Sequence, residues 1–317
     1  MRDTFSREIT YLRLSITELC NLRCRYCMTE EGVCKKSHEE MLTEDETVSA
    51  VRAAASLGVR KLRITGGEPL IKKNIVSICR RCGEIDGIDE LCITTNGILL
   101  PQLASLLKDA GVSRLNISLD TLDPDKYRYI TRGGELKDAV NGIKAAFDAG
   151  FEGIKINTVL VGGFNDDEVP SLAELTVRYP IDLRFIELMP MEGNRCFGKE
   201  AYIPCSHITN TLPGLVPEAH RDGVARMFRL PGAVGRIGLI NPVSDHFCKE
   251  CNRIRLTADG KIKPCLHSSA EFPIKGKTES EMLEVFKQAI QAKPEWHGEL
   301  NYASISNSGR EMNRIGG

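Results

Sequence analysis

Strand and helix signals alternate along the first part of the chain, and this rhythm limits the folds that it can adopt. From about Tyr11 to Met189 the alternation has a period of roughly 25–40 residues. The strand candidates are Tyr11–Thr17, Lys61–Thr65, Leu91–Thr95, Arg114–Leu119, Gly153–Leu160 and Leu183–Leu188. Repeated βα units of this kind predict a parallel sheet covered by helices, either open or closed into a barrel.

Start and stop residues mark the helices between these strands. Thr43 and Glu46 have the spacing of a capping box, and Gly58 is a C-terminal stop signal. Pro101 predicts the first turn of a second helix, and the range Glu135–Ala149 predicts a third. These helices would bury their apolar sides against the sheet.

After Met189 the rhythm is broken by prolines, and the chain becomes rich in predicted loops and short strands. A length of 317 residues allows one barrel-sized domain or two smaller ones. We therefore expect an α/β domain over residues 1–190 and a smaller α+β domain over residues 191–317, with one helix near Ser280–Gln291.

The composition excludes several classes of protein. Hydrophobic residues make up 42% and charged residues 27%, which is typical of a globular protein rather than a disordered or fibrous one. The net charge of −1 gives no support for a bulk binder of nucleic acid or of membrane surfaces. No apolar run approaches the roughly 18 residues of a spanning helix, and the N-terminus lacks a signal peptide, so we expect a cytoplasmic protein.

The predicted strands have one apolar and one polar face, which is unusual for a parallel sheet covered by helices. Leu12, Leu14 and Ile16, for example, alternate with polar residues. The charged members of the polar faces are Arg13, Lys61, Arg63, Arg114 and Lys155. Because unpaired buried charge is costly, these faces must line a wet or liganded space, and a basic lumen favours a polyanion. The alternatives are an interior ion-pair network, a solvated sheet face, or strand registers that are wrong by one residue.

Twelve cysteines indicate metal or redox chemistry in a chain without a secretion signal. Cys20, Cys24 and Cys27 follow directly on the first predicted strand, where βα enzymes place their active loops. Three thiolates leave one iron of a cubane cluster open for a further ligand. The alternatives are a zinc site completed by a distant histidine, or three unligated cysteines.

A second group consists of Cys248, Cys251 and Cys265. Arg253 and Arg255 follow Cys251 at alternating positions and form a predicted anion clamp beside a metal. The alternative is a structural zinc site with His246 or His267 as its fourth ligand. The remaining cysteines form no comparable group, and Cys79 with Cys82 is predicted to be an inert pair on a helix rather than a redox pair. The others are Cys34, Cys92, Cys196 and Cys205.

Two motifs resemble those of the radical S-adenosylmethionine (SAM) superfamily. The segment Cys20-Asn21-Leu22-Arg23-Cys24-Arg25-Tyr26-Cys27 resembles its cluster-binding signature, and Gly66-Gly67-Glu68-Pro69 resembles its GGEP loop. With the second cysteine spacing and the final Gly316-Gly317, the chain resembles the GTP 3′,8-cyclase (MoaA) family of molybdenum cofactor biosynthesis. This resemblance implies an incomplete (β/α)6 TIM-like barrel, followed by the smaller domain carrying a second iron–sulfur cluster.

The resemblance also implies roles for individual residues. One [4Fe–4S] cluster would be held by Cys20, Cys24 and Cys27, and the second by Cys248, Cys251 and Cys265. The residues expected to contact SAM are Tyr26, Gly67, Ser118 and Met189. Those expected to contact GTP are Arg13, which is also implied in catalysis, together with Lys61, Arg63, Thr94, Lys155, Arg253, Ile254 and Arg255. Leu266 and His267 depart from the family pattern, and a His267 ligand would disturb the second cluster.

The implied reaction converts GTP to (8S)-3′,8-cyclo-7,8-dihydroguanosine 5′-triphosphate. It requires an external electron donor, and a cyclic pyranopterin monophosphate synthase is expected downstream. The family suggests a homodimer, with no nucleic-acid or membrane partner. The competing interpretations are another radical SAM protein, such as a peptide-modifying enzyme, and a zinc-stabilised nucleotide-binding module without catalysis.

Overall fold

The computed structural model describes residues 1–33, 37–192, 194, 196–300, 302 and 305–316, and Cys34 and Gly317 lie outside them. Its central feature is a run of six parallel strands, β1 to β6, each hydrogen-bonded to the next in chain order. Their bounds are Tyr11–Ser15, Lys61–Thr65, Glu90–Thr95, Arg114–Ser118, Lys155–Leu160 and Asp182–Glu187. The predicted strands are thus confirmed.

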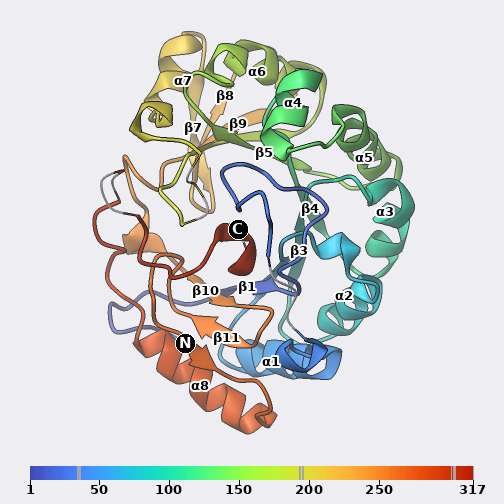
Figure 1. The fold of residues 1–317 in the computed structure, drawn as a ribbon, viewed down its shortest axis with the longest axis vertical. Helices are drawn as coiled ribbons and strands as arrows, with labels where there is room; N and C mark the ends of the chain where they lie inside the picture. The colour runs from blue at the N-terminus through green and yellow to red at the C-terminus, as the bar shows by residue number, and fades with distance from the viewer. Residues whose placement is uncertain (34–36, 193, 195, 301, 303–304, 317) are drawn as a thin grey trace.

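Helices cover the outer face of these strands (Figure 1). They are α1 (Glu44–Ser56), α2 (Ile75–Gly83), α3 (Leu100–Asp109), α4 (Pro124–Thr131), α5 (Leu136–Asp148) and α6 (Val169–Arg178). The capping box between Thr43 and Glu46 is present at the start of α1, and Pro101 lies in the first turn of α3. Short 3-10 helices occupy His38–Glu40, Pro69–Ile71, Asp166–Glu168, Lys199–Ala201, Cys248–Glu250 and Met312–Arg314.

The C-terminal part of the chain extends the same sheet at both edges. On one side β9 (Arg236–Ile240) pairs in parallel with β6, and β8 (Ala225–Arg229) and β7 (Val216–Asp222) follow. On the other side β10 (Arg253–Leu256) pairs in parallel with β1, followed by β11 (Lys261–Lys263) and β12 (Phe272–Pro273). The result is a twelve-stranded sheet that curves into an incomplete barrel, as Figure 1 shows.

Two further helices belong to this C-terminal part, α7 (Ser206–Thr211) and α8 (Glu279–Gln291). Thr278 and Glu281 form a capping box that begins α8, which confirms the helix predicted near Ser280–Gln291. Helix α8 packs against α1 and β11, so the end of the chain is tied to its beginning. No described helix is both long and apolar enough to cross a bilayer.

Apolar and polar side chains lie on opposite faces of the central strands, as the sequence pattern predicts. The apolar side chains, such as Leu12, Leu14, Leu62 and Ile64, are fully buried in the layer between sheet and helices. The prediction for Arg114 was wrong, because this first residue of β4 reaches solvent and pairs with Glu90 at 3.0 Å instead of lining the interior.

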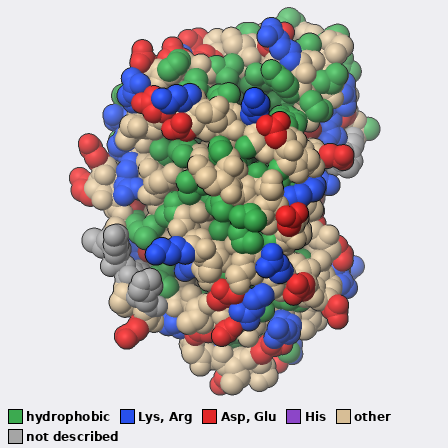
Figure 2. All heavy atoms as spheres, turned by 90° about the vertical axis from the view of Figure 1, so that its right-hand side faces the viewer, with side chains coloured by type: hydrophobic (Ala, Val, Ile, Leu, Met, Phe, Trp, Pro, Cys, Tyr) green, Lys and Arg blue, Asp and Glu red, His purple; other side chains and the backbone are tan. Residues whose placement is uncertain are grey.

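The last residues of the chain enter the barrel, and Figure 1 shows the C-terminus at the centre of the ring of strands. Arg310 anchors this segment, since its guanidinium binds Asp259 at 2.9 Å and Glu271 at 2.5 Å. Asn313 Nδ2 donates to the carbonyl oxygen of Glu18 at 3.0 Å, on the loop after β1. The outer face at the right of Figure 1 carries basic and acidic side chains of mixed sign (Figure 2), consistent with the low net charge.

Candidate active site

A cavity of about 360 Å³ lies inside the barrel, lined by the polar faces of the strands and the loops after them. Both cysteine groups reach it, although more than 200 residues separate them in the sequence. Of the predicted site residues, the cavity is lined by Arg13, Cys20, Cys24, Tyr26, Cys27, Lys61, Arg63, Gly67, Thr94, Ser118, Lys155, Met189, Cys248, Cys251, Arg253, Arg255 and Cys265. The exception is Ile254, whose side chain is buried in the hydrophobic core, so that only its backbone could face a ligand.

The first cysteine group lies on the loop that follows β1. The backbone N–H groups of Arg23 and Arg25 donate to carbonyl oxygens of α4 and its end, which holds the loop over the barrel. Leu22 N–H donates to Cys20 Sγ at 3.3 Å. Burial raises the pKa of Cys20 to about 11 and that of Cys27 to about 12. The thiolate is the metal-binding form of cysteine, so a metal ion held by these residues would have to displace the thiol protons.

The distances between the sulfur atoms indicate whether a group of cysteines suits a multi-iron cluster or a single metal ion. Among the described residues, one group of three potential ligands has all its ligand atoms within 4.8 Å, and neither cysteine group is that one. A tetrahedral zinc ion with bonds of about 2.3 Å to sulfur needs its ligands closer than that. Both cysteine groups therefore fit a larger inorganic core better than one zinc ion.

The glycine loop after β2 packs directly on the cysteine loop. Gly67 N–H donates to the carbonyl oxygen of Thr17 at 2.7 Å, and a Cβ on Gly67 would lie less than 3.0 Å from the Leu19 carbonyl oxygen. Glu68 braces the loop, because its carboxylate accepts from Thr95 Oγ1 at 2.7 Å and from Asn96 N–H at 2.7 Å. Burial raises the pKa of Glu68 to about 7, although these hydrogen bonds by themselves would lower it. Gly66 and Gly67 must be glycines because their backbone lies too close to the backbone of the cysteine loop to leave room for a side chain.

Tyr26 is fixed by a partner that the sequence reasoning did not single out. Its hydroxyl donates to Asp120 Oδ2 at 2.8 Å, and Val159 N–H donates to Asp120 Oδ1 at 2.8 Å. Burial raises the pKa of Asp120 to about 6, and burial beside Asp120 raises the pKa of Tyr26 well above its ordinary value. Asp120 directly follows the fourth predicted strand, and an acidic residue at a strand's carboxyl end was the available signal.

Basic side chains crowd the wall formed by β1, β2 and β10. Residues Arg13, Arg63 and Arg255 occupy the same register position on these three strands. Burial and the neighbouring arginines lower the pKa of Arg13 to about 10 and that of Arg255 to about 9. Concentrated positive charge of this kind is relieved when a polyanion binds.

Tyr11 lies within this basic wall and was missed as a site residue. Arg63 Nε donates to the Tyr11 hydroxyl, and the Arg253 guanidinium lies 5.6 Å from the centre of the tyrosine ring. Burial alone would raise the pKa of Tyr11, but Arg63, Arg13 and Arg253 outweigh it and lower the pKa to about 7. Tyr11 shares the strand parity of Arg13, and this was the signal that could have placed it in the cavity.

Beyond the three arginines, the cavity wall offers amides as well as cations. Lys155 on β5 is buried, and Lys61 pairs with Glu90 at 2.7 Å, so the predicted alternative of an ion-pair network applies to Lys61 in this structure. The side-chain oxygens of Asn116 and Asn157 are buried in the cavity wall without a hydrogen-bond partner. Orphaned acceptors beside cations fit a polar ligand that brings its own donors.

The second cysteine group faces the cavity from the loops around β10 and β11. Burial would raise the pKa of Cys251, but the nearby Lys293 and Arg253 outweigh it and lower the pKa below its ordinary value. Lys293 Nζ also donates to the carbonyl oxygens of Arg253 and Pro264 at 2.8 and 2.9 Å. Lys293 therefore holds the loop in place and also puts a positive charge beside the sulfur atom of Cys251.

His267, the departure from the family pattern, is buried beside this group. Its Nδ1 lies 2.8 Å from Ser306 Oγ, and the burial, together with His297 and Arg255, lowers its pKa to about 3. His267 therefore remains neutral, and its Nδ1 is already hydrogen-bonded to Ser306.

Comparison with known proteins identifies the family. A model described as "Radical SAM superfamily" matches residues 14–176, and one described as "Molybdenum Cofactor Synthesis C" matches residues 181–299. A GTP 3′,8-cyclase from Alkaliphilus oremlandii is 50% identical, and one from Moorella thermoacetica is 45% identical, each aligned over 100% of both chains. The chain belongs to the GTP 3′,8-cyclase family.

Members of this family are radical SAM enzymes, and membership implies a [4Fe–4S] cluster and SAM as cofactors. The fold agrees with that of a solved structure. A crystal structure of Streptococcus suis SuiB matches 89% of this chain and 66% of its own with a TM-score of 0.65. At 16% identity this likeness concerns the fold alone.

Proposed function

We propose that this protein converts GTP to (8S)-3′,8-cyclo-7,8-dihydroguanosine 5′-triphosphate, the first step of molybdenum cofactor biosynthesis. The observation that carries the proposal is that two groups of three cysteines and the basic side chains line one cavity. The names of the relatives give the same reaction class.

In this proposal Cys20, Cys24 and Cys27 hold the SAM-cleaving [4Fe–4S] cluster. The three cysteines are half-buried, and their sulfur atoms are not all within the 4.8 Å that would group them around a single ion. The chemistry that the cluster and SAM supply when bound is reductive formation of a 5′-deoxyadenosyl radical, which takes the 3′ hydrogen of the ribose. Tyr26, Gly67, Ser118 and Met189 border the same end of the cavity and would position SAM.

The basic wall is proposed to bind the triphosphate. Arg13, Arg63, Arg253 and Arg255 offer planar guanidinium groups, a shape that suits phosphate oxygens, and each would bind through the N–H groups that the protein does not use. Arg253 Nε is buried without a hydrogen-bond partner, which supports a ligand at this position. Lys61, Thr94 and Lys155 line the neighbouring wall and would complete the contacts to GTP.

The second cysteine group is proposed to hold another [4Fe–4S] cluster with one open iron, which would orient the guanine base. Cys248, Cys251 and Cys265 line the cavity beside Arg253, and Lys293 stabilises negative charge on Cys251. With the triphosphate held by arginines and the base held near these cysteines, the chain would restrict GTP to conformations in which C3′ approaches C8. The enclosing barrel and the C-terminal segment would exclude water from the reactive carbon.

Other parts of the proposal do not depend on the cavity. We infer a division into residues 1–190 and 191–317, with the two parts sharing one sheet. The reaction needs an external one-electron donor. A downstream cyclic pyranopterin monophosphate synthase, a homodimeric state and a cytoplasmic location are further expectations of the same assignment.

The test is an anaerobic incubation of the reconstituted, reduced protein with SAM and GTP. The proposal predicts about eight iron and eight sulfide per chain, together with formation of 5′-deoxyadenosine in proportion to GTP consumed. Formation of 5′-deoxyadenosine without GTP consumption would reject the cyclase and leave another radical SAM reaction. Abundant zinc with no iron would reject both radical SAM interpretations, the GTP cyclase and any other radical SAM enzyme.

A further inference from the structure

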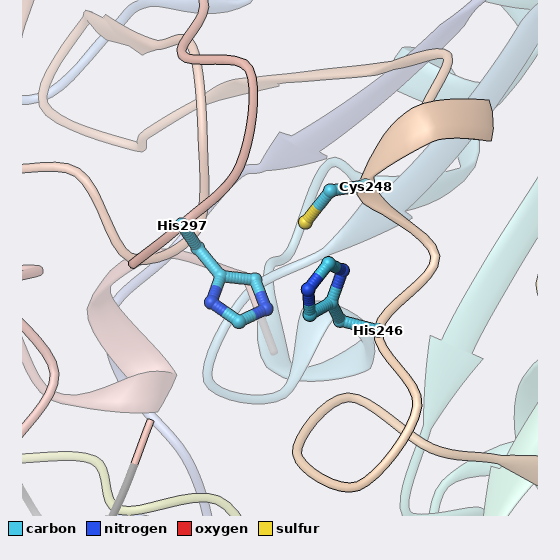
Figure 3. Close-up of side chains that lie close together, drawn as sticks. All are labelled: His246, Cys248 and His297. Atoms are coloured by element: carbon cyan, nitrogen blue, oxygen red, sulfur yellow. The ribbon is translucent and has the colours of Figure 1, made fainter. Parts of the chain in front are cut away.

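A second arrangement of metal-binding side chains overlaps the second cysteine group. The ligand atoms of His246, Cys248 and His297 all lie within 4.8 Å of one another, and Figure 3 shows the thiol and both imidazoles pointing toward a common centre. His246 comes from the loop after β9, Cys248 begins the 3-10 helix that follows this loop, and His297 comes from the segment after α8. The three side chains border the cavity, so a bound ion could keep one coordination position open toward it.

His297 is prepared as a ligand by its own backbone. Its Nδ1 lies 2.7 Å from the carbonyl oxygen of Gly298, which can only accept, so Nδ1 carries the proton. The other ring nitrogen, Nε2, is buried and has no hydrogen-bond partner. A histidine with Nδ1–H on a carbonyl and a free Nε2 lone pair has the tautomer and orientation of a metal ligand.

His246 is oriented by aromatic packing. Its ring stacks on Trp296 with centroids 5.6 Å apart and an angle of 26° between the planes. It meets the His297 ring edge-on at 5.2 Å. Trp296 is 45% exposed, and its contact with His246 helps to fix the imidazole near Cys248.

We propose that the cluster-free protein binds one zinc ion through His246, Cys248 and His297. Two imidazole nitrogens and one thiolate are a donor set suited to zinc, and their close grouping suits a single ion. The Cys248, Cys251 and Cys265 group is more widely spaced and does not compete on geometry for one ion. This differs from the zinc site considered from sequence, which paired all three cysteines with His246 or His267.

The site has a consequence for cofactor assembly, and this part rests on the proposed second cluster. Cys248 belongs to both ligand sets, and one thiolate cannot complete both centres at once. Zinc bound by His246 and His297 therefore withholds Cys248 and blocks assembly of the second cluster, while the first cysteine group stays available. The two histidines act as a metal-selection device at the second cluster position.

The zinc site is tested first with Co²⁺ alone, added anaerobically to the full-length, cluster-free chain. We expect one strongly bound Co²⁺ with tetrahedral d–d bands and a charge-transfer band of one thiolate. His246→Ala and His297→Ala should each weaken binding at least about tenfold. His207→Ala is the matched control, because this histidine lies on α7 with Nε2 3.3 Å from Thr211 Oγ1. Unchanged affinity in both site variants, or a band of three thiolates, would overturn the site.

The exclusion is tested by loading the wild-type chain with one equivalent of Zn²⁺ before reconstitution with iron and sulfide. We expect about four iron per chain instead of about eight, and His297→Ala should restore about eight in the presence of Zn²⁺. Full iron uptake by zinc-loaded wild type would refute the exclusion. If wild type without zinc also stops at four, the proposed second cluster fails, while the Co²⁺ result still decides the zinc site.

Discussion

Arg255 Nη1 donates to the carbonyl oxygen of Gly316 at 2.7 Å, which brings the end of the chain into the basic wall of the cavity. Arg13 Nη2 donates to the same oxygen at 3.2 Å. One backbone carbonyl thus orients two guanidinium groups, one from β1 and one from the neighbouring strand β10. The C-terminal segment is therefore part of the cavity wall.

Gly316→Ala is predicted to disrupt this arrangement. Gly316 has a φ of +70°, and an added Cβ would lie less than 3.0 Å from Thr65 Oγ1, so the threonine side chain or the segment must shift. We expect the segment to shift and to release both arginines. We expect GTP turnover to fall by roughly tenfold or more, the equivalent of one or two lost charge-assisted hydrogen bonds. The measurement is single-turnover consumption of GTP.

Gly309→Ala is the matched control for this prediction. Gly309 has a similar φ of +66°, but an added Cβ there meets nothing within 4 Å. Both variants bear the backbone cost of a left-handed alanine, about 1–2 kcal/mol, and only Gly316→Ala adds the clash. Equal turnover in the two variants would show that the position of Gly316 does not matter.

Arg253→Ala is predicted to weaken GTP binding by roughly 10- to 100-fold while leaving the first cluster intact. A hydrogen bond to a charged group contributes about 1.5–3 kcal/mol, and Arg253 Nε is buried without a hydrogen-bond partner. Arg114→Ala is the control, since Arg114 pairs with Glu90 at the surface. Calorimetric titration with GTP decides, and equal affinity in both variants would reject the proposed role of Arg253.

These residues show what strand parity can and cannot predict. Alternation along β1 and β2 placed Arg13 and Arg63 in the interior because side chains switch faces at every residue. The same rule misplaced Arg114, since it says nothing about where along the barrel axis a residue lies, and the first residue of β4 reaches solvent. Tyr11 has the same parity as Arg13 but was not among the predicted site residues, although its hydroxyl belongs to the basic wall.

Long-range pairing was beyond sequence reasoning for a physical reason. The C-terminal region contains β9 and β10 as short strands, and nothing in their local pattern specifies that one joins β6 and the other β1. Their register depends on tertiary packing of both sheet edges. The Tyr26–Asp120 hydrogen bond and the His246–Cys248–His297 group are hidden for the same reason, because each joins residues from separate loops.

Gly67→Ala is predicted to abolish SAM binding. The added Cβ would approach the backbone of Glu18 and Leu19, which cannot move aside as a flexible side chain could. The glycine loop would then separate from the loop that carries the first cysteine group. Gly83→Ala, at the end of α2, is the control because its Cβ would meet its nearest neighbour at an ordinary 3.4 Å. Equilibrium SAM binding measures the effect, and normal binding by the Gly67 variant would contradict the packing argument.

Cys24→Ala is predicted to remove about four of eight iron atoms and all SAM cleavage. Two remaining cysteines cannot hold a cubane cluster that needs three protein ligands and an open iron. Cys196→Ala is the control, because Cys196 is an exposed cysteine outside both cysteine groups. Iron analysis and 5′-deoxyadenosine formation provide independent measurements. Retained cleavage in the Cys24 variant would remove Cys24 from the ligand set.

The buried carboxyl of Asp120 predicts a defined dependence of stability on pH. Burial raises its pKa from 3.8 to about 6 in the folded chain, so the folded state holds a proton that the unfolded state has released between these values. Its contribution to stability is present below about pH 4 and is lost as the pH rises through about 6. The pKa difference corresponds to about 3 kcal/mol.

Asp120→Asn should therefore remove this part of the pH dependence. Denaturant unfolding of the cluster-free chain, followed from pH 4 to pH 7, measures the free energy of unfolding of both proteins. Relative to wild type, the variant should gain on the order of 3 kcal/mol over this range, because asparagine has no proton to lose. A parallel pair of curves would mean that Asp120 is ionised at little cost, and that hydrogen bonds from Tyr26 and Val159 fully offset its burial.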